Sequence, residues 1–541
     1  MPALIPPWLA KLGRYTILLL AGFALLFAAA WKGWIFPSDR QYRPRVPDPK
    51  AIAVPSGYHV EVVASGLNAP SALEITPDGT IYIGESGYGG AYAATAGYEG
   101  VTAGRILRLN RNGGITVVTG DFKAPLAGFY HDRDGNLIVS HNGSITEVTP
   151  RGRRDLISGL PSLGDHKNNN VVAGPDGRIY WAQGTVTNTG IVGLDNWVLW
   201  GRFFPSPKDV PCRDIVLNGV NVTTADPRSL IPFQRVQTGA FSPFGHKTAP
   251  DQVVKGELPC NGAIMRMNPD GTGLELVAWG LRNPFDLRFG PDGKLYATDN
   301  GPDTRGSRPM QGPDLFHQIR EGAWYGWPDF WNGRPATELA TSGREKPQML
   351  LARLPVKRPE KAFATFGDHV AASGFDFAPA AFGYEGQAFV ARWGSGFPAT
   401  NQDPSLALGF DIMRMDLRTR KPEVFARNVK AGPASVNGTG GFERPTVVRF
   451  GPDGAMYVLD WGHLSVTRKG PYHVPDGGVL WRISRDGTGS LGYPYRPPEP
   501  HRVGGLSGVS PAGGLTLSTA LFCLAGWLVF RARGKKSFHM E

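Results

Sequence analysis

Apolar and polar residues alternate in short runs between residues 51 and 490, and each run follows a turn signal. In six places an Asp-Gly or Glu-Gly pair is followed at once by such a run. Asp-Gly supplies the positive φ of a tight hairpin turn, and strict alternation is typical of a half-buried strand. The six turns begin at Asp78, Asp134, Asp176, Asp292, Glu385 and Asp453.

A further apolar strand follows each of these runs, and an outer strand follows most of them. Together with the segment that leads into each turn, the repeated unit is a four-stranded antiparallel meander. Six such units with no helical segments between them predict an all-β protein, a six-bladed β-propeller whose radial closure protects the sheet edges. The further strands begin at Ile106, Ile145, Ile264, Leu315, Ile412 and Leu480, and the outer strands at Ile115, Arg154, Leu274 and Glu423.

The last unit has no outer strand of its own, because its final apolar strand runs into a Gly/Pro-rich tail. A spare strand, residues 58–63, precedes the first unit. It leads into residues 66–79, which align without a gap to residues 280–293. We therefore expect this N-terminal strand to complete the last blade and close the ring within residues 51–490.

An apolar stretch near the start of the chain, residues 15–36, follows a short N-terminal segment, residues 1–14. One interpretation is a signal peptide cleaved at Ala28-Ala29-Ala30. The other is a retained transmembrane anchor, which the length of the stretch favours, because a bilayer requires about 20 apolar residues. A Pro-rich linker, residues 37–50, connects it to the propeller.

A second apolar stretch, residues 515–530, follows a Pro/Gly-rich linker at residues 491–514. A basic tail, residues 531–541, comes directly after it. Positive residues beside a transmembrane helix remain in the cytoplasm. The expected topology is therefore two transmembrane helices with both termini in the cytoplasm, and a propeller on the periplasmic side of a bacterial cytoplasmic membrane.

Composition narrows the class of protein further. Glycine (72 of 541 residues) and proline (47) are about twice as frequent as usual, which excludes a coiled coil or a helical bundle. The 41% of apolar residues opposes disorder, and the glycines have no three-residue period that would indicate collagen. The net charge of +11 comes from basic residues scattered among acids, so we expect no nucleic acid partner.

The chain has three cysteines, Cys212, Cys260 and Cys523. None lies in a Cys-x-x-Cys-His motif, so we expect no covalent haem. Cys212 and Cys260 both lie in an insertion that the third unit carries at about residues 185–262. Since this insertion is expected outside the cytoplasm, where thiols are oxidised, we expect the two to form a disulfide.

The segment that leads into each inner strand of a propeller lies at one mouth of its central channel. Ten positions before the acid of each turn, these segments carry mostly cationic side chains. The position shifts by one residue in two blades, and the fifth blade is irregular. Such a ring fits either a solvated channel mouth or a functional site. Its members are Asn68, Lys123, His166, Arg282, His369 and Arg444.

Neighbouring residues add chemistry to this ring. Asp165 precedes His166, and the pair could act as a base. Arg282 and Asn283 together offer a fork of donors for the carboxylates or carbonyls of a planar ligand. Residues 298–303 offer main-chain oxygens and carboxylates, the ligands that calcium prefers.

Four stretches, residues 164–180, 280–284, 299–302 and 322–328, resemble the glucose/sorbosone dehydrogenase family. Members of that family are soluble or periplasmic six-bladed propellers that use pyrroloquinoline quinone (PQQ) and calcium. The resemblance is specific over these four motifs and is architectural over the rest of residues 51–484.

The resemblance implies roles for particular residues. His166 corresponds to the general base, oriented by Asp165, and Arg282 stabilises the developing oxyanion. Arg282 and Asn283 also contact the cofactor beside its reactive carbonyl. The remaining implied cofactor contacts are Arg444, which would grip a carboxylate, with His369 and Lys123, and the implied calcium site is Gly301, Pro302 and Asp303.

The sequence also departs from the family. The family has a cofactor-binding lysine after the second strand of the fifth blade, where this chain has residues 391–395, and only Arg392 could replace it. The family's second arginine beside Arg444 has no clear match. The long insertion and the two membrane segments are further departures from the soluble enzymes.

Two functions therefore stay open. The first is a membrane-anchored, quinoprotein-type dehydrogenase that oxidises a sugar or polyol and passes electrons to membrane quinone or to a cytochrome. The second is a non-catalytic propeller that serves as an accessory or scaffold subunit of a larger membrane electron-transfer complex, respiratory or photosynthetic. His166, Arg282 and Asn283 favour the enzyme, whereas the missing lysine favours the scaffold.

Overall fold

The computed structural model describes Gly22 and residues 45–88, 100–231, 233–306, 308–339, 346–395, 408–467 and 470–497. The chain divides into two compact units, and the propeller lies in the one that comprises residues 43–465 and 471–498. Apart from Gly22, the two expected membrane segments lie outside the described residues. Within the described part, no helix has the length and apolar character needed to cross a membrane.

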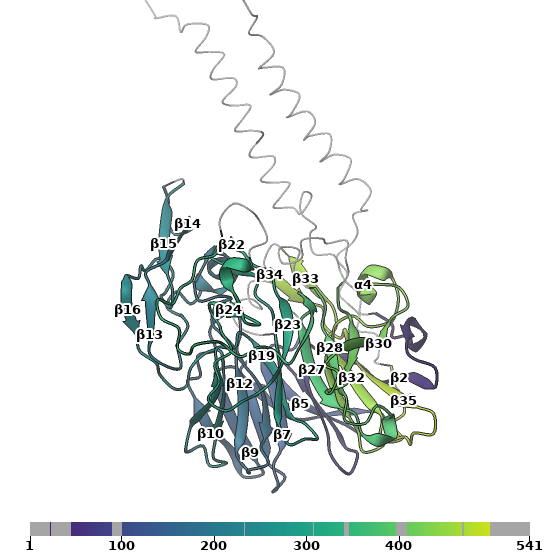
Figure 1. Cartoon of the computed structure of the whole chain (residues 1–541). Helices are drawn as coiled ribbons and strands as arrows, with labels where there is room; N and C mark the ends of the chain where they lie inside the picture. Colours follow the sequence, from purple (N-terminus) through teal and green to yellow (C-terminus); the bar gives the residue numbers. More distant parts are fainter. Residues whose placement is uncertain are drawn as a thin grey trace, which may run out of the picture. The chain divides into compact units, whose positions relative to one another are not determined.

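The propeller consists of six blades, each a four-stranded antiparallel sheet (Figure 1). The first three blades contain β3 (Pro70–Ile75), β4 (Ile81–Glu85), β5 (Gly104–Leu109) and β6 (Ile115–Phe122); β7 (Leu126–His131), β8 (Leu137–His141), β9 (Ser144–Thr149) and β10 (Gly152–Ser158); and β11 (Asn168–Ala173), β12 (Ile179–Gln183), β17 (Ala263–Met267) and β18 (Glu275–Trp279).

The last three blades follow the same order, and the short strand β1 (Ile52–Ala53) extends the fifth blade beside its outer strand. They contain β19 (Pro284–Phe289), β20 (Leu295–Asp299), β23 (Pro313–Gln318) and β26 (Ala364–Asp368); β27 (Ala372–Phe377), β28 (Ala388–Arg392), β29 (Asp411–Met415) and β30 (Pro422–Asn428); and β31 (Pro445–Phe450), β32 (Met456–Asp460), β35 (Gly478–Arg485) and β2 (Tyr58–Leu67).

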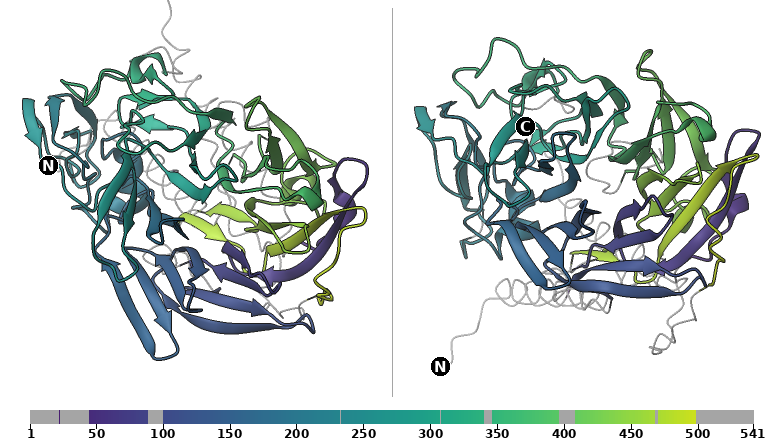
Figure 2. Two further views of the ribbon diagram at one scale, coloured as in Figure 1. Left: turned by 60° about the horizontal axis from the view of Figure 1, so that its bottom comes forward. Right: turned by 90° about the horizontal axis from the view of Figure 1, so that it is seen from below.

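The ring closes as the sequence predicts. Strand β2 pairs antiparallel with β35, from Tyr58 opposite Arg485 to Leu67 opposite Gly478, so the N-terminal strand forms the outer edge of the last blade. The six inner strands contact one another in cyclic order, β3, β7, β11, β19, β27, β31 and back to β3. Figure 2 shows the two ends of the propeller side by side, β2 in purple and β35 in yellow.

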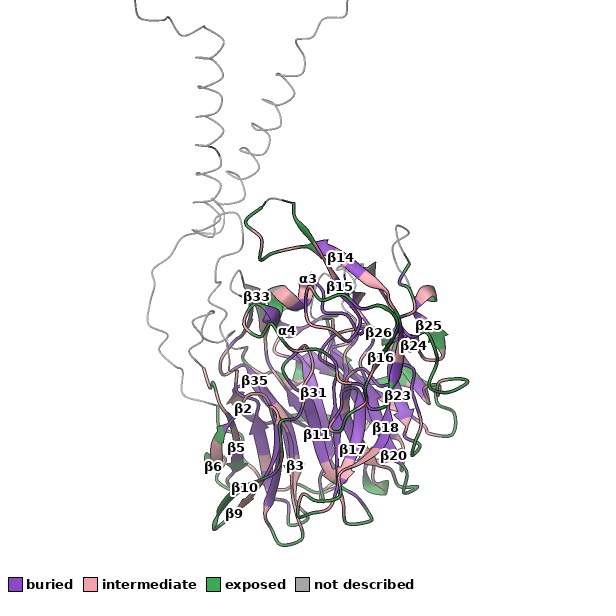
Figure 3. Ribbon diagram, turned by 90° about the vertical axis from the view of Figure 1, so that its left-hand side faces the viewer, coloured by how far each residue is buried: buried purple, intermediate pink, exposed green. Residues whose placement is uncertain are grey.

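Each hairpin between an inner strand and its neighbour turns at the expected acid-glycine pair. The six turn glycines have φ between 72° and 81°, the left-handed conformation that favours glycine. Every residue of β8, β12, β20 and β32 is buried, because both faces of each blade pack against neighbouring blades (Figure 3). Burial of a large apolar side chain contributes about 1.5–3 kcal/mol, so these interfaces between blades stabilise the ring.

The insertion between β12 and β17 carries its own small elements. They are α3 (Leu194–Asn196), the π-helical turn η2 (Trp197–Gly201), and two antiparallel strand pairs, β13 (Ile215–Asn218) with β16 (Pro250–Val254) and β14 (Asn221–Ala225) with β15 (Arg235–Gly239). A disulfide joins Cys212 to Cys260, with their Cα atoms 5.0 Å apart, as expected from the sequence.

Short elements also occur in the loops and at the edges of the blades. They are η1 (Pro49–Ala51), β21 (Thr304–Arg305), β22 (Arg308–Pro309), β24 (Phe330–Trp331), β25 (Arg334–Pro335), η3 (Ala336–Glu338), η4 (Ala380–Phe382), α4 (Ala434–Asn437), β33 (Leu464–Thr467) and β34 (Gly470–His473).

The central channel is crossed by a buried ion pair. Asp286 on β19 accepts hydrogen bonds from the side chain of Asn170 on β11 at 2.5 Å and from the main-chain N–H of Phe375 on β27 at 3.0 Å. Its Oδ2 also pairs with Arg449 on β31 at 3.0 Å. Asp286 thus ties four of the six inner strands together, and the cavity beside it, about 10 Å³, has room for roughly one water molecule.

Candidate functional site

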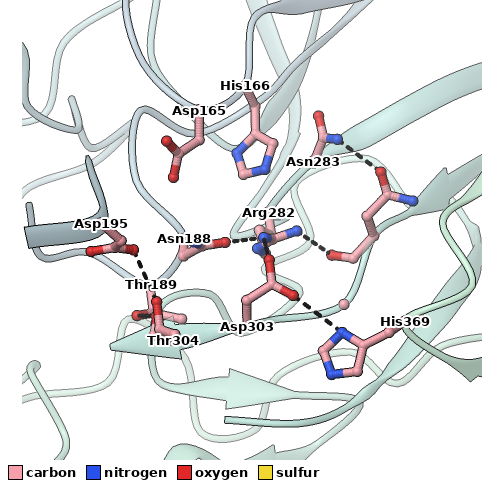
Figure 4. Close-up of polar contacts among 12 residues, drawn as sticks. Asp165, His166, Asn188, Thr189, Asp195, Arg282, Asn283, Asp303, Thr304 and His369 are labelled. Carbon is pink, nitrogen blue, oxygen red and sulfur yellow. Dashed lines mark hydrogen bonds and ion pairs between the residues drawn. The ribbon is translucent and has the colours of Figure 1, made fainter. Parts of the chain in front are cut away.

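His166 lies in the segment that leads into β11 (Figure 4). Thr185 holds its imidazole ring. The Nδ1 atom is 3.0 Å from the main-chain oxygen of Thr185 and 3.2 Å from its hydroxyl oxygen. Because a carbonyl oxygen only accepts hydrogen bonds, Nδ1 carries the proton. The lone pair of the neutral ring is then on Nε2, for which the described residues provide no hydrogen-bond partner.

The environment of His166 keeps the imidazole neutral. Burial and the nearby charge of Arg282 lower the pKa of His166 well below its usual value, against a smaller opposing effect from the hydrogen bond to Thr185. A neutral histidine with an open Nε2 can accept a proton at physiological pH. The geometry is therefore that of a general base.

Arg282 lies at the corresponding position of the next blade, before β19, and is 3% exposed. Its guanidinium donates to the main-chain oxygen of Asn300 at 3.1 Å, to Asp303 at 2.9 Å and to the side-chain oxygen of Asn188. These partners fix its orientation, and its Nε is a buried donor that has no partner among the described residues.

Asp303 links Arg282 to His369, whose Nδ1 is 3.1 Å from the other carboxylate oxygen. Burial by itself would raise the pKa of Asp303, but Arg282 and His369 hold that pKa below its usual value. Asp303 is therefore a carboxylate at neutral pH. It stabilises the buried cation and does not point freely into the mouth of the channel.

Asn283 stands beside His166. Its amide nitrogen donates to the side chain of Asn300 at 2.8 Å, and its Oδ1 accepts from Asn169 at 2.8 Å. Gly184 separates the two site residues, since a Cβ atom there would lie 2.4 Å from the Cβ of His166 and 2.9 Å from the Oδ1 of Asn283. Only glycine fits at position 184, and its small size lets His166 and Asn283 lie side by side at the channel mouth.

Asp165 does not orient His166, contrary to the expectation from the sequence. Its Oδ1 accepts a hydrogen bond from the indole of Trp200 at 2.6 Å, and its Oδ2 accepts one from the side chain of Asn196 at 2.7 Å. Burial and the nearby Asp195 raise the pKa of Asp165 to about 7. Asp165 therefore fixes the insertion to the third blade, and Thr185 takes the orienting role.

The expected calcium ligands lie in the loop after β20. The main-chain oxygens of Gly301 and Pro302 accept no hydrogen bond from any described residue, so both are available as the oxygen ligands that calcium prefers. The N–H of Gly301 donates to Asp314 at 2.5 Å, which fixes the loop. Within the described ranges, no group of three or more acidic, histidine or cysteine side chains is arranged to hold a metal.

Arg392, which the sequence offered as a substitute for the family's cofactor-binding lysine, is engaged in an ion pair. Its guanidinium makes a two-point ion pair with Asp411, at 2.6 and 2.5 Å, and donates to the main-chain oxygen of Phe366 at 3.0 Å. The positive charge expected to replace the family's lysine is thus neutralised by a residue of the same blade.

Arg444 is buried beneath aromatic rings. Its Cζ is 3.9 Å from the centroid of Trp393 and 5.4 Å from that of Phe410. Burial lowers its pKa to about 10, so it remains a cation. Lys123 is exposed, in the segment that leads into β7. The structure therefore brings together His166, Arg282, Asn283, Gly301, Pro302, Asp303 and His369, while Arg392 and Arg444 are held by other partners.

Thr185 and Asn188 were not singled out in the sequence analysis, and Asp299 was included there only as part of the calcium-binding segment 298–303. Thr185 orients His166, Asn188 accepts from Arg282, and Asp299 accepts the main-chain N–H groups of Arg282 and Asn283. Two other blades have a carboxylate at the strand position of Asp299, Glu85 and Asp460, and each also accepts a main-chain N–H at the mouth. The recurring acid at this strand position could therefore have been found in the sequence as a residue that holds the channel mouth.

The fold and the site define a six-bladed β-propeller with a polar site at one channel mouth. The chain matches no protein-family model. It is similar to quinoprotein glucose dehydrogenase B from Acinetobacter calcoaceticus, with 24% identity over 307 residues, or 53% of this chain and 55% of that protein. The chain thus matches about half the length of this relative.

Two solved structures are similar to the chain over most of its length. One is the holo form of the pyranose dehydrogenase PQQ domain from Coprinopsis cinerea, with a TM-score of 0.48, 14% identity, and coverage of 82% of this chain and 98% of that one. Another is the PQQ-bound aldose sugar dehydrogenase from Streptomyces coelicolor, with a TM-score of 0.43, 17% identity, and coverage of 80% and 99%.

Proposed function

We propose that this protein is a quinoprotein-type dehydrogenase that oxidises a sugar or polyol. The observation that carries the proposal is the neutral His166, whose open Nε2 lies at the same mouth as the buried cation Arg282. The similarity to quinoprotein glucose dehydrogenase B supports the same class of reaction.

The residues of the site have separate tasks in this proposal. The Nε2 atom of His166 accepts the proton of the substrate hydroxyl. Arg282 stabilises the negative charge that develops on that oxygen, and its burial strengthens the effect. Asn188, Asn300 and Asp303 keep Arg282 in place, so little reorganisation accompanies the reaction.

The site fits the proposed cofactor on one side. The unpartnered Nε of Arg282 and the free main-chain oxygens of Gly301 and Pro302 suit a quinone carbonyl and a calcium ion. Bound PQQ would supply the two-electron acceptor that the side chains lack. On the other side the fit is poorer, because Asp411 neutralises Arg392, the one described cation at the position of the family's cofactor-binding lysine.

The proposed location is the bacterial cytoplasmic membrane, with the propeller on the periplasmic side. The apolar stretches at residues 15–36 and 515–530 and the basic tail after residue 530 support this topology. With no site for covalent haem in the sequence, the electrons would pass to membrane quinone or to a separate cytochrome.

The Arg392–Asp411 ion pair and the stacking of Arg444 on Trp393 favour a second candidate. A propeller in which Arg392 and Arg444 are engaged within the protein could serve as an accessory subunit of a membrane electron-transfer complex. In that case the polar mouth would contact a partner subunit.

Cofactor binding separates the two candidates. The full-length chain is purified in detergent, mixed with PQQ and calcium, and dialysed, after which its absorption spectrum and calcium content are measured. Retained cofactor and dye reduction with an aldose or polyol support the enzyme. Loss of both PQQ and calcium on dialysis, with no dye reduction, contradicts it and leaves the accessory subunit.

A further inference from the structure

Three large apolar side chains stand exposed at the tip of the β14–β15 hairpin. Leu230 is 100% exposed, Phe233 is 97% exposed and Ile231 is 68% exposed. Single exposed apolar residues are common, but three large ones on one loop mark a surface that contacts something other than water. We call these three side chains the hairpin tip.

Hydrogen bonds within the loop hold the described residues beside the hairpin tip. The N–H of Asp226 donates to the main-chain oxygen of Gln234 at 2.9 Å, and the N–H of Ile231 donates to the hydroxyl of Ser229 at 3.0 Å. The side chain of Arg228 pairs with Asp226 at 2.9 Å. These polar groups are thus paired within the loop, while Leu230, Ile231 and Phe233 are exposed to solvent.

Arginine side chains lie directly behind the hairpin tip. Arg235 on β15 is exposed and donates to the main-chain oxygen of Thr223 at 3.1 Å. Arg228 is 41% exposed. Asp226 neutralises Arg228, so Arg235 provides the positive charge behind the tip. An apolar tip with a cation behind it matches the layers of a bilayer surface, where acyl chains lie beneath anionic phosphates.

The insertion leaves the propeller at the mouth that carries the candidate site, because it follows the end of β12 at Gln183. The first described residue of the propeller is held at the same mouth, since Arg45 pairs with Asp460 at the end of β32 at 2.6 Å. Only residues 37–44 separate Arg45 from the expected transmembrane segment. Eight extended residues reach about 30 Å, so that membrane would be close to this mouth.

We propose that the hairpin tip inserts into the surface of the lipid bilayer. A protein partner is a poorer fit, because a stable protein interface buries more than about 1,000 Å² and the tip presents only three side chains. A few large apolar side chains backed by basic residues are enough for contact with a bilayer surface. The proposal depends on the expected membrane attachment, and it does not depend on the proposed cofactor.

The inference also orients the candidate site. Both the hairpin tip and His166 belong to the mouth at which the second strand of each blade ends. With the tip in the bilayer surface, this mouth faces the lipid, and the turns at the other end of the blades, such as the β7–β8 turn at Asp134, face away from it.

The test uses the full-length chain with Cys523→Ser, so that one introduced cysteine can carry an environment-sensitive fluorophore. One sample carries Phe233→Cys in the hairpin tip, and the control carries Asp134→Cys in the exposed β7–β8 turn. Both are reconstituted into vesicles of phosphatidylcholine and phosphatidylglycerol that contain lipid spin-labelled near the headgroup. We expect strong quenching at position 233 and little at position 134.

A third sample adds Leu230→Ser and Ile231→Ser to Phe233→Cys. Removing two large apolar side chains should shift the insertion equilibrium by more than about tenfold and abolish most of the quenching. Both side chains are exposed, so the fold should be unaffected, which an unchanged melting temperature verifies. If the chain floats with the vesicles but quenching is equal at positions 233 and 134, the proposed insertion of the hairpin tip is wrong. If the chain does not float with the vesicles, the expected membrane attachment is wrong as well.

Discussion

The Nδ1 atom of His166 lies 3.0 Å from the main-chain oxygen of Thr185, and this contact determines which ring nitrogen carries the proton. Because the acceptor belongs to the backbone, the tautomer is a property of the fold and does not depend on a neighbouring side chain. The arrangement leaves Nε2 as the basic atom of the candidate site.

Replacement of the base should separate binding from chemistry. His166→Asn removes the basic nitrogen, and we expect the rate of dye reduction to fall by roughly 10²–10⁴-fold while cofactor binding is retained. The matched control, Thr185→Val, keeps the main-chain oxygen, so its rate should fall by less than about tenfold. An unchanged rate in His166→Asn would show that another group accepts the proton.

The pH profile of the reaction follows from the lowered pKa of His166. The base loses activity only when it is protonated, and a lowered pKa moves that protonation to more acidic pH. We expect kcat/KM to stay constant down to below pH 6.5, the ordinary pKa of a histidine side chain, and then to fall. An acid limb centred above pH 6.5 would contradict the assignment of His166.

Release of Arg392 should improve cofactor binding. Asp411→Asn removes the carboxylate that neutralises Arg392 and retains the shape of the side chain. A freed guanidinium could pair with a carboxylate of PQQ, so we expect the dissociation constant to fall by at least about tenfold in a fluorescence titration. The control Asp416→Asn breaks an ion pair with the exposed Arg418 of the same blade and should leave the titration unchanged. Equal affinity in both variants would exclude Arg392 from the site.

The disulfide of the insertion should stabilise the protein. Cys212 and Cys260 are 48 positions apart, and a cross-link of this length lowers the free energy of folding by about 3–4 kcal/mol through the entropy of the unfolded chain. Cys212→Ser with Cys260→Ser should therefore unfold at lower urea concentration than the natural chain. Cys523→Ser is the control and should not change the midpoint. A thiol assay that finds three free thiols in the unfolded, unreduced chain would refute the bond.

Burial of His473 should make stability depend on pH. Burial lowers the pKa of His473 from 6.5 to about 4, so below pH 6.5 the unfolded chain binds a proton that the folded chain does not. The free energy of unfolding should fall as the pH decreases from 6.5 to about 4, by up to about 3 kcal/mol from this residue. His473→Asn should lack this contribution. The measured quantity is the difference between the two proteins at each pH, because Asp165 and Asp209, whose pKa values are raised to about 7, act in the opposite direction in both.

The sequence predicts the blades well because their signals are local. An acid-glycine turn and the alternation that follows it depend on adjacent residues, and the closing strand is evident from the gapless match between residues 66–79 and 280–293. The approximate spacing of ten residues before the turn places His166 and Arg282 at one mouth, because all blades share a register.

The partners of the site residues are harder to predict, because they come from distant parts of the chain. Asp165 binds Trp200 of the insertion, and no repeat pattern extends into that region. Arg392 binds Asp411 on the next strand. The resemblance to the family assigns Arg392 a cofactor-binding position and gives no indication of this ion pair. A recurring acid seven positions after the turn, at Asp299 and Asp460, was a usable signal for the residues that hold the mouth.

The Asp286–Arg449 ion pair across the channel has a kinetic consequence for the proposed enzyme. Since this ion pair links inner strands across the channel, we expect a sugar and the oxidant that restores the site to arrive through the same opening. The sugar and the oxidant would then bind one after the other, and the oxidised sugar would leave before the oxidant binds. Initial rates measured at several oxidant concentrations should therefore give parallel double-reciprocal lines, the pattern of a ping-pong order.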